Sequence, residues 1–446
     1  MTEQQYIDLF QQHRSEIDSN SSEGINKARD AAFETFKKIG FPTTKDEDYK
    51  HSNIARVFDG NFGLNLRNVP IAVNPYDVFK CDVPDLKTHL HFLINERYYD
   101  KIKPTESLPK GVFAGSLSLF SEKYPQIFRR YYARIADYSN NGTAAYNTMF
   151  AQDGFVLYLP EKTVIEKPIQ LINILRGKVD MNVNRRVLII AEKNTQAKLL
   201  ICDHTVDDVR FVVTQVTEVF ADTDSQVDIY ELEENSEKVS RINSFFSQQK
   251  ENSSVIAAGI TLHNGYTRNN FNVQILGKHA EAHVGGLAIC DKTQHVDNFA
   301  YLDHVFPHCT SNQLFKTILD ERATGIFCGK IMVEKNAQKT QAYQTNRNLC
   351  VSNNAQMYAK PQLEIYADDV KCSHGLTTGQ LDQEALFYMR ARGIDKDEAR
   401  LLLMVAFTRD VIDMIRIDSL QERIEYLIDK RFRGELLRCG NCEVCK

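Results

Sequence analysis

The sequence predicts a mainly β protein in which a β-solenoid core lies between an N-terminal and a C-terminal α-helical region. Apolar residues recur with helical spacing near both ends of the chain, whereas they alternate with period two through the middle. The chain has 446 residues, of which 43% are hydrophobic and 25% are charged, as is typical of a folded globular protein. This length allows two to four structural units with a sizeable core.

Residues 1–110 are expected to be mainly helical. The clearest amphipathic helix has its apolar face formed by Ile25, Ala28, Ala32, Phe36 and Ile39. Gly40 is placed to end this helix, and Pro42 follows it, as is common just beyond a helix C-terminus.

Residues 111–378 are expected to form the β core. Period-two alternation is clear in several short segments, among them residues 155–159, 187–189, 271–275 and 331–333. Turn-forming residues separate the segments, and no long helical pattern intervenes from about residue 112 onward. A sandwich, a barrel or a solenoid would accommodate so many short strands. The solenoid is favoured because the similar segments AQKTQAYQ (337–344) and AQMYAKPQ (355–362) lie 18 residues apart, as repeating units would.

Residues 379–434 are expected to form a compact helical module. Asp382 is a candidate N-cap for its first helix, which Gly393 is placed to end. Asp395 and Glu398 have the spacing of a capping box at the start of a second helix, and a third follows before the module ends.

Composition and charge narrow the classes of partner and of compartment. Lys and Arg total 54 against 59 Asp and Glu, so the net charge is -5 and no basic field favours nucleic acid or an anionic membrane. The polar N-terminus lacks the layout of a secretory signal. The longest dense apolar run, residues 401–407, is far shorter than the roughly 18 residues that suggest a membrane span. We therefore expect a cytoplasmic protein with reduced thiols.

The stretch YADDVKCSHG, residues 366–375, holds the strongest candidate site. Cys372 and His374 are two residues apart, so on a strand their side chains point to the same face, roughly 6–7 Å apart. Thiolate and imidazole are both ligands for zinc, iron and iron–sulfur centres. The alternative is a structural role, as a buried thiol beside a hydrogen-bonded histidine at a strand end.

The runs PQLEIYADDVKCSHG and GQLDQEALFYMRARGI resemble the SufD-type members of the SufB/SufD family, which belong to the Suf system of iron–sulfur cluster assembly. Near the N-terminus, PTTKDEDYKHSNI is similar to the family's Pro-x-x-x-x-(acidic)-(aromatic)-Lys box. SufB-type members carry an EHEAT-type motif in place of CSHG, so the resemblance is to the D type. The sequence departs from the family pattern at Tyr49, where tryptophan is usual, and at residues 376–378, where Leu-Thr-Thr replaces the commoner Ala-Thr.

The resemblance implies a right-handed parallel β-helix and a non-catalytic scaffold subunit. Such a subunit pairs with SufB through the β-helices and receives the SufC ATPase on the helical module. His374 matches a proposed ligand of a transient iron–sulfur cluster shared with SufB, and Cys372 is a second candidate. The resemblance also implies a role in iron acquisition, leaves flavin binding open, and allows a homodimer when SufB is absent. No G-x-x-x-x-G-K-[ST] motif occurs, so any ATP is expected to be handled by a partner.

The tail at 435–446 carries three cysteines with Cys-x2-Cys-x2-Cys spacing, namely Cys439, Cys442 and Cys445. This spacing brings three thiols close enough to share one ion, although it lacks the fourth cysteine and the proline of a bacterial ferredoxin run. A labile zinc or iron site is the working hypothesis, and an exposed terminus without a function is the alternative.

Two other functions stay open at this point. Asp368 and Asp369 suggest a carbohydrate-active enzyme with paired carboxylates, although adjacent residues on a strand point to opposite faces. The other alternative is a SufB-like or homodimeric scaffold that acts without a paralogue.

The remaining histidines and cysteines of the middle region are expected to be structural. Four residues along a strand span about 13 Å, so two histidine pairs are not expected to bind one ion, namely His279 with His283 and His304 with His308. Surface or turn positions are the expectation for these histidines and for His263 and His295. Four cysteines are expected to be small buried residues of the solenoid core, namely Cys290, Cys309, Cys328 and Cys350.

Overall fold

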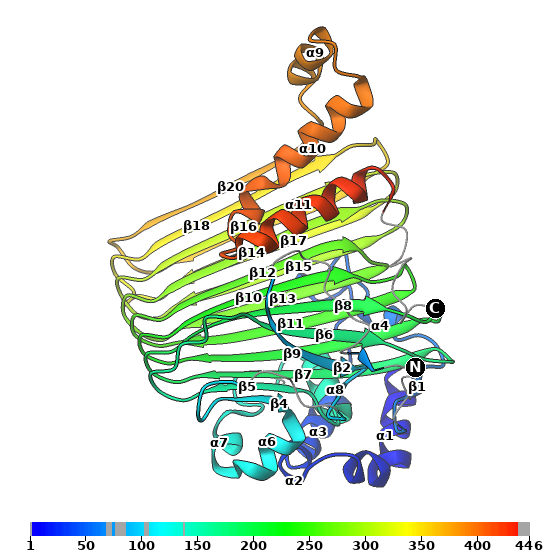
Figure 1. The fold of residues 1–446 in the computed structure, drawn as a ribbon, viewed down its shortest axis with the longest axis vertical. Helices are drawn as coiled ribbons and strands as arrows, with labels where there is room; N and C mark the ends of the chain where they lie inside the picture. Colours follow the sequence, from blue (N-terminus) through cyan, green and yellow to red (C-terminus); the bar gives the residue numbers. More distant parts are fainter. Residues whose placement is uncertain (1, 68–73, 76–85, 102–106, 137–138, 436–446) are drawn as a thin grey trace.

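The computed structural model describes residues 2–67, 74–75, 86–101, 107–136 and 139–435. Its core is a parallel β-solenoid of about 8 turns with helices at both ends (Figure 1). The predicted fold class, mainly β with a solenoid between helical regions, is confirmed. Among the described residues, no helix combines the length and the apolar character needed to cross a bilayer.

Each turn of the solenoid contributes one strand to each of two ten-stranded sheets. The first sheet contains, in spatial order, β4 (Phe113–Ser116), β5 (Phe155–Leu159), β7 (Met181–Ala191), β9 (Phe211–Ala221), β11 (Val239–Gln249), β13 (Tyr266–Ile275), β15 (His295–His304), β17 (Thr324–Val333) and β19 (Gln356–Ile365), with β1 (Gly63–Leu64) beside β7. The second sheet contains β3 (Arg97–Tyr98), β2 (His89–Ile94), β6 (Ile169–Leu175), β8 (Gln196–Thr205), β10 (Gln226–Glu234), β12 (Ser254–His263), β14 (Glu281–Cys290), β16 (Thr310–Leu319), β18 (Gln341–Cys350) and β20 (Lys371–Gly379).

The strand register defines the true repeat of the solenoid. Gln196, Gln226, Ser254 and Glu281 occupy equivalent positions in successive parallel strands of the second sheet, so one turn takes 27 to 30 residues here. The two similar segments that lie 18 residues apart lead into β18 and β19, which belong to different sheets. Their recurrence therefore marks two successive strands of one turn and not the full turn of the solenoid.

The expectation of strands from residue 112 onward is wrong between residues 117 and 150. Three helices lie there, namely α6 (Leu117–Lys123), α7 (Pro125–Tyr131) and α8 (Gly142–Phe150). The first two have seven residues each, too few to show a helical period, and all nine residues of α8 are buried, so it has no polar face. Conversely, strands β2 and β3 lie inside the segment that was expected to be mainly helical.

The N-terminal helices close the first end of the solenoid around an aromatic cluster. They are α1 (Thr2–Ser19), α2 (Glu23–Asn26), α3 (Arg29–Ile39), the 3-10 turn η1 (Glu47–Tyr49) and α4 (Ile54–Val57). The amphipathic helix predicted from Ile25 to Ile39 is divided into α2, which holds Ile25, and α3, which holds Ala32 and Phe36 on its buried face. Gly40 ends α3 with a φ of 64°. Tyr6 packs edge-on against Phe58 and Tyr146, which joins α1 to the buried helix α8.

The C-terminal module contains α9 (Gln383–Ala391), α10 (Lys396–Ile412) and α11 (Asp418–Phe432). As predicted, Asp382 caps α9 by accepting backbone hydrogen bonds, Gly393 follows it with positive φ, and Asp395 caps α10. Figure 1 shows α11 lying along the solenoid while α9 projects beyond its last strands. The contact of α11 is apolar, because Ile424 and Ile428 pack with Ile260 and Leu287 of the second sheet.

Candidate functional site

Strand β20 is the last strand of the second sheet and forms one edge of that sheet (Figure 1). Within the described residues its strand partner is β18 alone, on one side. Most of β20 is exposed, whereas every second residue of β18 is buried. The structure therefore leaves the C-terminal end of the solenoid uncovered.

Cys372 and His374 lie on this uncovered strand, and both face the inside of the solenoid. In register, Cys372 is opposite Ala342 and His374 is opposite Gln344, and both partners are buried inward-facing residues of β18. The expected placement of the two side chains on one face agrees with this register. A Cβ atom added at Gly375, next to His374, would meet nothing within 4 Å.

The two side chains have different surroundings. Cys372 is half-buried and packs against a small apolar cluster that includes Val333 and Ala342. Burial raises the pKa of the Cys372 thiol, which favours its protonated form. His374 is exposed, because no further strand follows β20 in the part of the chain that the structure describes.

At this position a single chain places two side chains of metal-ligating type, Cys372 and His374, next to each other on one strand face. No group of three or more His, Cys, Asp or Glu side chains in the described part of the chain is placed to hold a metal ion. The three cysteines of the proposed tail site, Cys439, Cys442 and Cys445, lie outside the described residues.

The residues that lie beneath His374 were not predicted from the sequence as part of the site. Gln344 is buried directly next to it in register, and its Nε2 atom donates to Oε1 of Gln313 at 2.6 Å. Gln313 occupies the equivalent position one turn earlier. In the sequence, polar residues recur at this position at intervals of about one solenoid turn. The length of a turn became known only from the strand register, so the recurrence could not be recognised from the sequence.

Exposed apolar side chains surround the open end. Those on or beside the last strands are Tyr343, Tyr358, Ile365, Tyr366 and Leu376. On helix α9, Phe387 is 75% exposed and Tyr388 is 60% exposed. Exposed apolar patches of this kind mark interaction surfaces.

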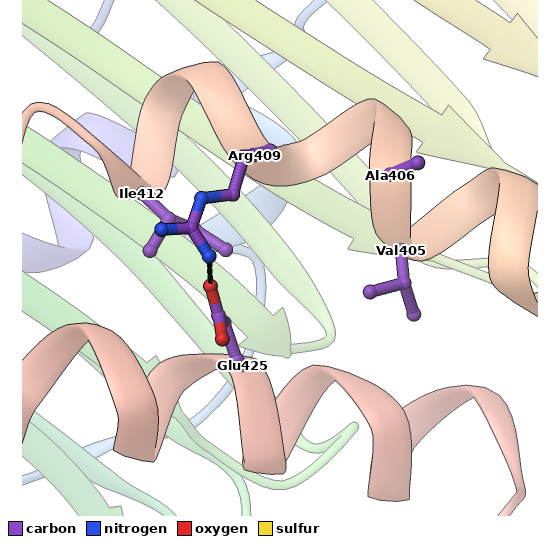
Figure 2. A pocket seen from close by; sticks show the side chains of 5 residues that line it. All are labelled: Val405, Ala406, Arg409, Ile412 and Glu425. Atoms are coloured by element: carbon purple, nitrogen blue, oxygen red, sulfur yellow. Dashed lines mark hydrogen bonds and ion pairs between the residues drawn. The ribbon is translucent and has the colours of Figure 1, made fainter.

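Helices α10 and α11 enclose a pocket of about 400 Å³ in the same module. Figure 2 shows its lining by Val405, Ala406, Arg409, Ile412 and Glu425. The side chains of Arg409 and Glu425 form an ion pair across it. The pair links the two helices at the pocket.

Of the six histidines expected at surface or turn positions, His304 alone is buried, so the prediction is wrong for this residue. His304 is buried inside the solenoid and shares a 2.8 Å hydrogen bond with Ser311, and His295 stacks on Tyr266. The two histidine pairs that were not expected to bind one ion, His279 with His283 and His304 with His308, do not converge. Exposed His279 instead stacks on His308 of the next turn, with ring centroids 5.2 Å apart.

The cysteine predictions hold with one correction. Cys290 and Cys309 are buried in apolar clusters of the solenoid, and Cys350 packs at the edge of such a cluster. Cys328 is buried on the outer face, where its sulfur lies 4.0 Å from Asp48 of the N-terminal segment, and not in the solenoid core. The N-terminal segment covers this part of the sheet, and sequence periodicity cannot report such a contact.

The carboxylates considered for sugar chemistry do not form a pair. Asp369 makes an ion pair with Lys339, and both Asp368 and Asp369 are exposed in a turn ahead of β20. Paired catalytic carboxylates lie about 5–10 Å apart across a substrate. This geometry gives no support to a carbohydrate-active enzyme.

Two family models match this chain. "SUF system FeS cluster assembly, SufBD core domain" matches residues 174–407, and "SufBD protein N-terminal region" matches residues 1–171. An iron–sulfur cluster assembly SufBD family protein of Synechocystis is 27% identical over 419 residues, covering 91% of each chain.

Two further relatives are named more narrowly. The iron–sulfur cluster assembly protein SufD of Escherichia coli is 38% identical over 167 residues, which cover 37% of this chain and 40% of that protein. The chloroplastic protein ABCI7 of Arabidopsis thaliana is 28% identical over 414 residues, which cover 88% and 83% of the two chains. Because the two matched models together span most of the sequence, the chain belongs to the SufBD family of iron–sulfur cluster assembly proteins.

Proposed function

We propose that this chain is a SufD-type scaffold subunit that assembles iron–sulfur clusters together with a SufB-type partner. The observation that carries the proposal is the Cys372-x-His374 pair, which lies on the inward-facing side of the strand at the uncovered end of the solenoid. The CSHG sequence and the 38% identity to a relative named SufD support the D type over the B type.

The proposed site uses the pair as half of a shared set of ligands. Iron in a cluster takes thiolate or imidazole ligands, and one chain offers two of them at this position. We propose that the remaining ligands come from the partner, so that the nascent cluster forms between two subunits. A shared site releases its cargo when the subunits move apart, which a ligand set held within one chain does not allow.

The exposed surfaces suggest where the partners dock. We propose that the open strand edges and aromatic residues near β19 and β20 meet the β-solenoid of the SufB-type partner. Phe387 and Tyr388 on α9 suit an apolar contact with the SufC ATPase. ATP turnover is assigned to SufC, so this subunit is a non-catalytic cytoplasmic scaffold that also takes part in iron acquisition. Without the partner, the same edges allow a homodimer, and we assign no flavin site.

The decisive experiment is anaerobic co-expression with SufB and SufC, followed by quantification of iron and sulfide and by absorbance spectra. Three versions of the chain are compared: the native chain, His374→Ala and the matched control His279→Ala, which removes an exposed turn histidine. We expect all three to form the complex and only His374→Ala to lose most of its cluster. Unchanged cluster content in His374→Ala would remove the proposed role.

The same preparation separates the D type from a SufB-like scaffold. A stable mixed complex with SufB and SufC is expected. Exclusive self-association, with clusters formed in the absence of SufB, would instead favour a homodimeric scaffold.

A further inference from the structure

The inward-facing column that ends at His374 changes character along the solenoid. The position of His374 is occupied in the preceding turns, from first to last, by Leu199, Ile229, Ala257, Val284, Gln313 and Gln344. The first four belong to the apolar core. The column begins one and two turns before Leu199, with Ile169 and His89. From Leu199 onward only its last three positions are polar, and they lead from the buried interior to the exposed imidazole.

The opposite wall of the solenoid makes room for these polar side chains. In the facing column of the first sheet, Phe245 and Phe271 are followed by the smaller Ala300 and Gly329, before Pro361 on the last strand. A Cβ atom on Gly329 would lie 2.3 Å from Nε2 of Gln344 and 2.9 Å from Oε1 of Gln313. The absence of a side chain at Gly329 therefore leaves the space that the two amides occupy.

Backbone carbonyls set the direction of the amide chain. Nε2 of Gln313 lies 3.5 Å from the carbonyl oxygen of Ala300 and 3.4 Å from that of Lys330, and both of these atoms only accept hydrogen bonds. Oε1 of Gln313 is therefore left to accept from Nε2 of Gln344, at 2.6 Å. The remaining atom, Oε1 of Gln344, is a buried acceptor with no hydrogen-bond partner in the structure.

An unpaired buried acceptor is costly, and the next residue in the column is His374. A neutral imidazole has one N–H donor and one bare nitrogen, and only the bare nitrogen binds a metal. We propose that Gln344 is a positioning residue that accepts the N–H of His374 and so fixes the imidazole in a single tautomer. The other nitrogen then stays bare and faces the shared site. This inference rests on the proposed function, in which His374 is a ligand.

The test measures the tautomer of His374 directly, in the full chain, without metal and without partner. The chain is labelled with ¹⁵N-histidine, and ring nitrogen shifts are recorded at about pH 8.5, two units above the ordinary pKa of histidine. The His374 signals are assigned by their loss in His374→Gln. We expect one tautomer in the native chain and a change in the tautomer ratio of about tenfold in Gln344→Leu, the equivalent of one hydrogen bond.

Two matched variants separate positioning from general disturbance. Gln344→Glu keeps an acceptor oxygen next to His374 and is expected to keep the native tautomer. Asn346→Leu removes another buried amide of β18, which is opposite Leu376, and is expected to leave the tautomer of His374 unchanged. The proposal is overturned if Gln344→Leu has the native ratio or if Asn346→Leu changes it equally.

A second route applies if Gln344→Leu does not fold. Gly329→Ala inserts a methyl group where Nε2 of Gln344 lies, so the same change in tautomer is expected. A native ratio in a folded Gly329→Ala protein counts against the proposal.

The tautomer measurement and the cluster measurement that tests the proposed function can fail independently of each other. In the complex, loss of the hydrogen-bond partner of a ligating histidine is expected to weaken iron binding about 10–100-fold. If His374→Ala leaves cluster content unchanged, the ligand role fails even where Gln344 fixes the tautomer. If His374→Ala abolishes the cluster and Gln344→Leu has the native tautomer, only the positioning role fails.

Discussion

Glu218 joins β9 to the segment between helices α7 and α8, and its replacement by alanine is expected to open that junction. Its carboxylate, on the buried side of β9, accepts four backbone N–H groups, those of Ala133, Arg134, Ile135 and Ala136, at 2.9 to 3.2 Å. It also pairs at 2.7 Å with the guanidinium of Arg186, which is equally buried.

The expected cost follows from these contacts. Glu218→Ala leaves the Arg186 charge buried without its partner and leaves four N–H groups without an acceptor. Breaking a buried ion pair in this way costs about 3–5 kcal/mol, and every 1.4 kcal/mol corresponds to a factor of ten in an equilibrium constant. The local opening of residues 133–136 is therefore expected to become more frequent by about two to four orders of magnitude.

Amide hydrogen exchange measures this opening residue by residue, and it does not require the whole chain to unfold in one step. The matched control is Glu192→Ala, because Glu192 accepts a single backbone N–H at 3.3 Å in an exposed setting. Protection of residues 133–136 is expected to fall in Glu218→Ala only. A loss of less than tenfold there, or an equal loss in the control, would refute the reasoning.

Three further outcomes are expected. Burial raises the pKa of Glu96 to about 7 from an ordinary 4.5, so its contribution to stability is full below about pH 4.5 and is lost as the pH rises through about 7. In thermal melts, Glu96→Gln should therefore gain stability relative to the native chain as the pH rises from 5 to 8. An equal difference in melting temperature between the variant and the native chain at pH 5 and at pH 8 would contradict this. Phe387→Asp should weaken binding to SufC by about tenfold or more in calorimetry, since a largely exposed aromatic residue on α9 is suited to anchor a contact, while Leu119→Asp, at the opposite end, should not. Removing residues 435–446 should lower the zinc or iron content of the purified chain, and unchanged metal content would eliminate the tail site.

The sequence predicted those features that local physical chemistry decides. Alternation with period two identified the strands because inward and outward side chains differ in solvent exposure at every step. The caps Asp382 and Asp395 were identifiable because an N-cap bonds within its own first turn. The spacing of Cys372 and His374 placed both on one face of a strand for the same local reason.

Other features depended on contacts between distant residues. Helix α8 escaped prediction because it is buried on every side, which removes the apolar stripe that identifies a helix. Cys328 was expected in the solenoid core, but the N-terminal segment buries it from outside.

The sequence by itself determined that this chain forms a solenoid and that one of its strands carries a cysteine and a histidine on the same face. The sequence also placed this strand at the end of the β core, but only the tertiary structure decided that the end is uncovered at His374 and that the hydrogen-bonded Gln344 and Gln313 lie beneath it in one column. The physical reason is that side-chain direction along a strand is a local property. Stacking between turns depends on pairing across about 30 residues, whose register is set by the whole core.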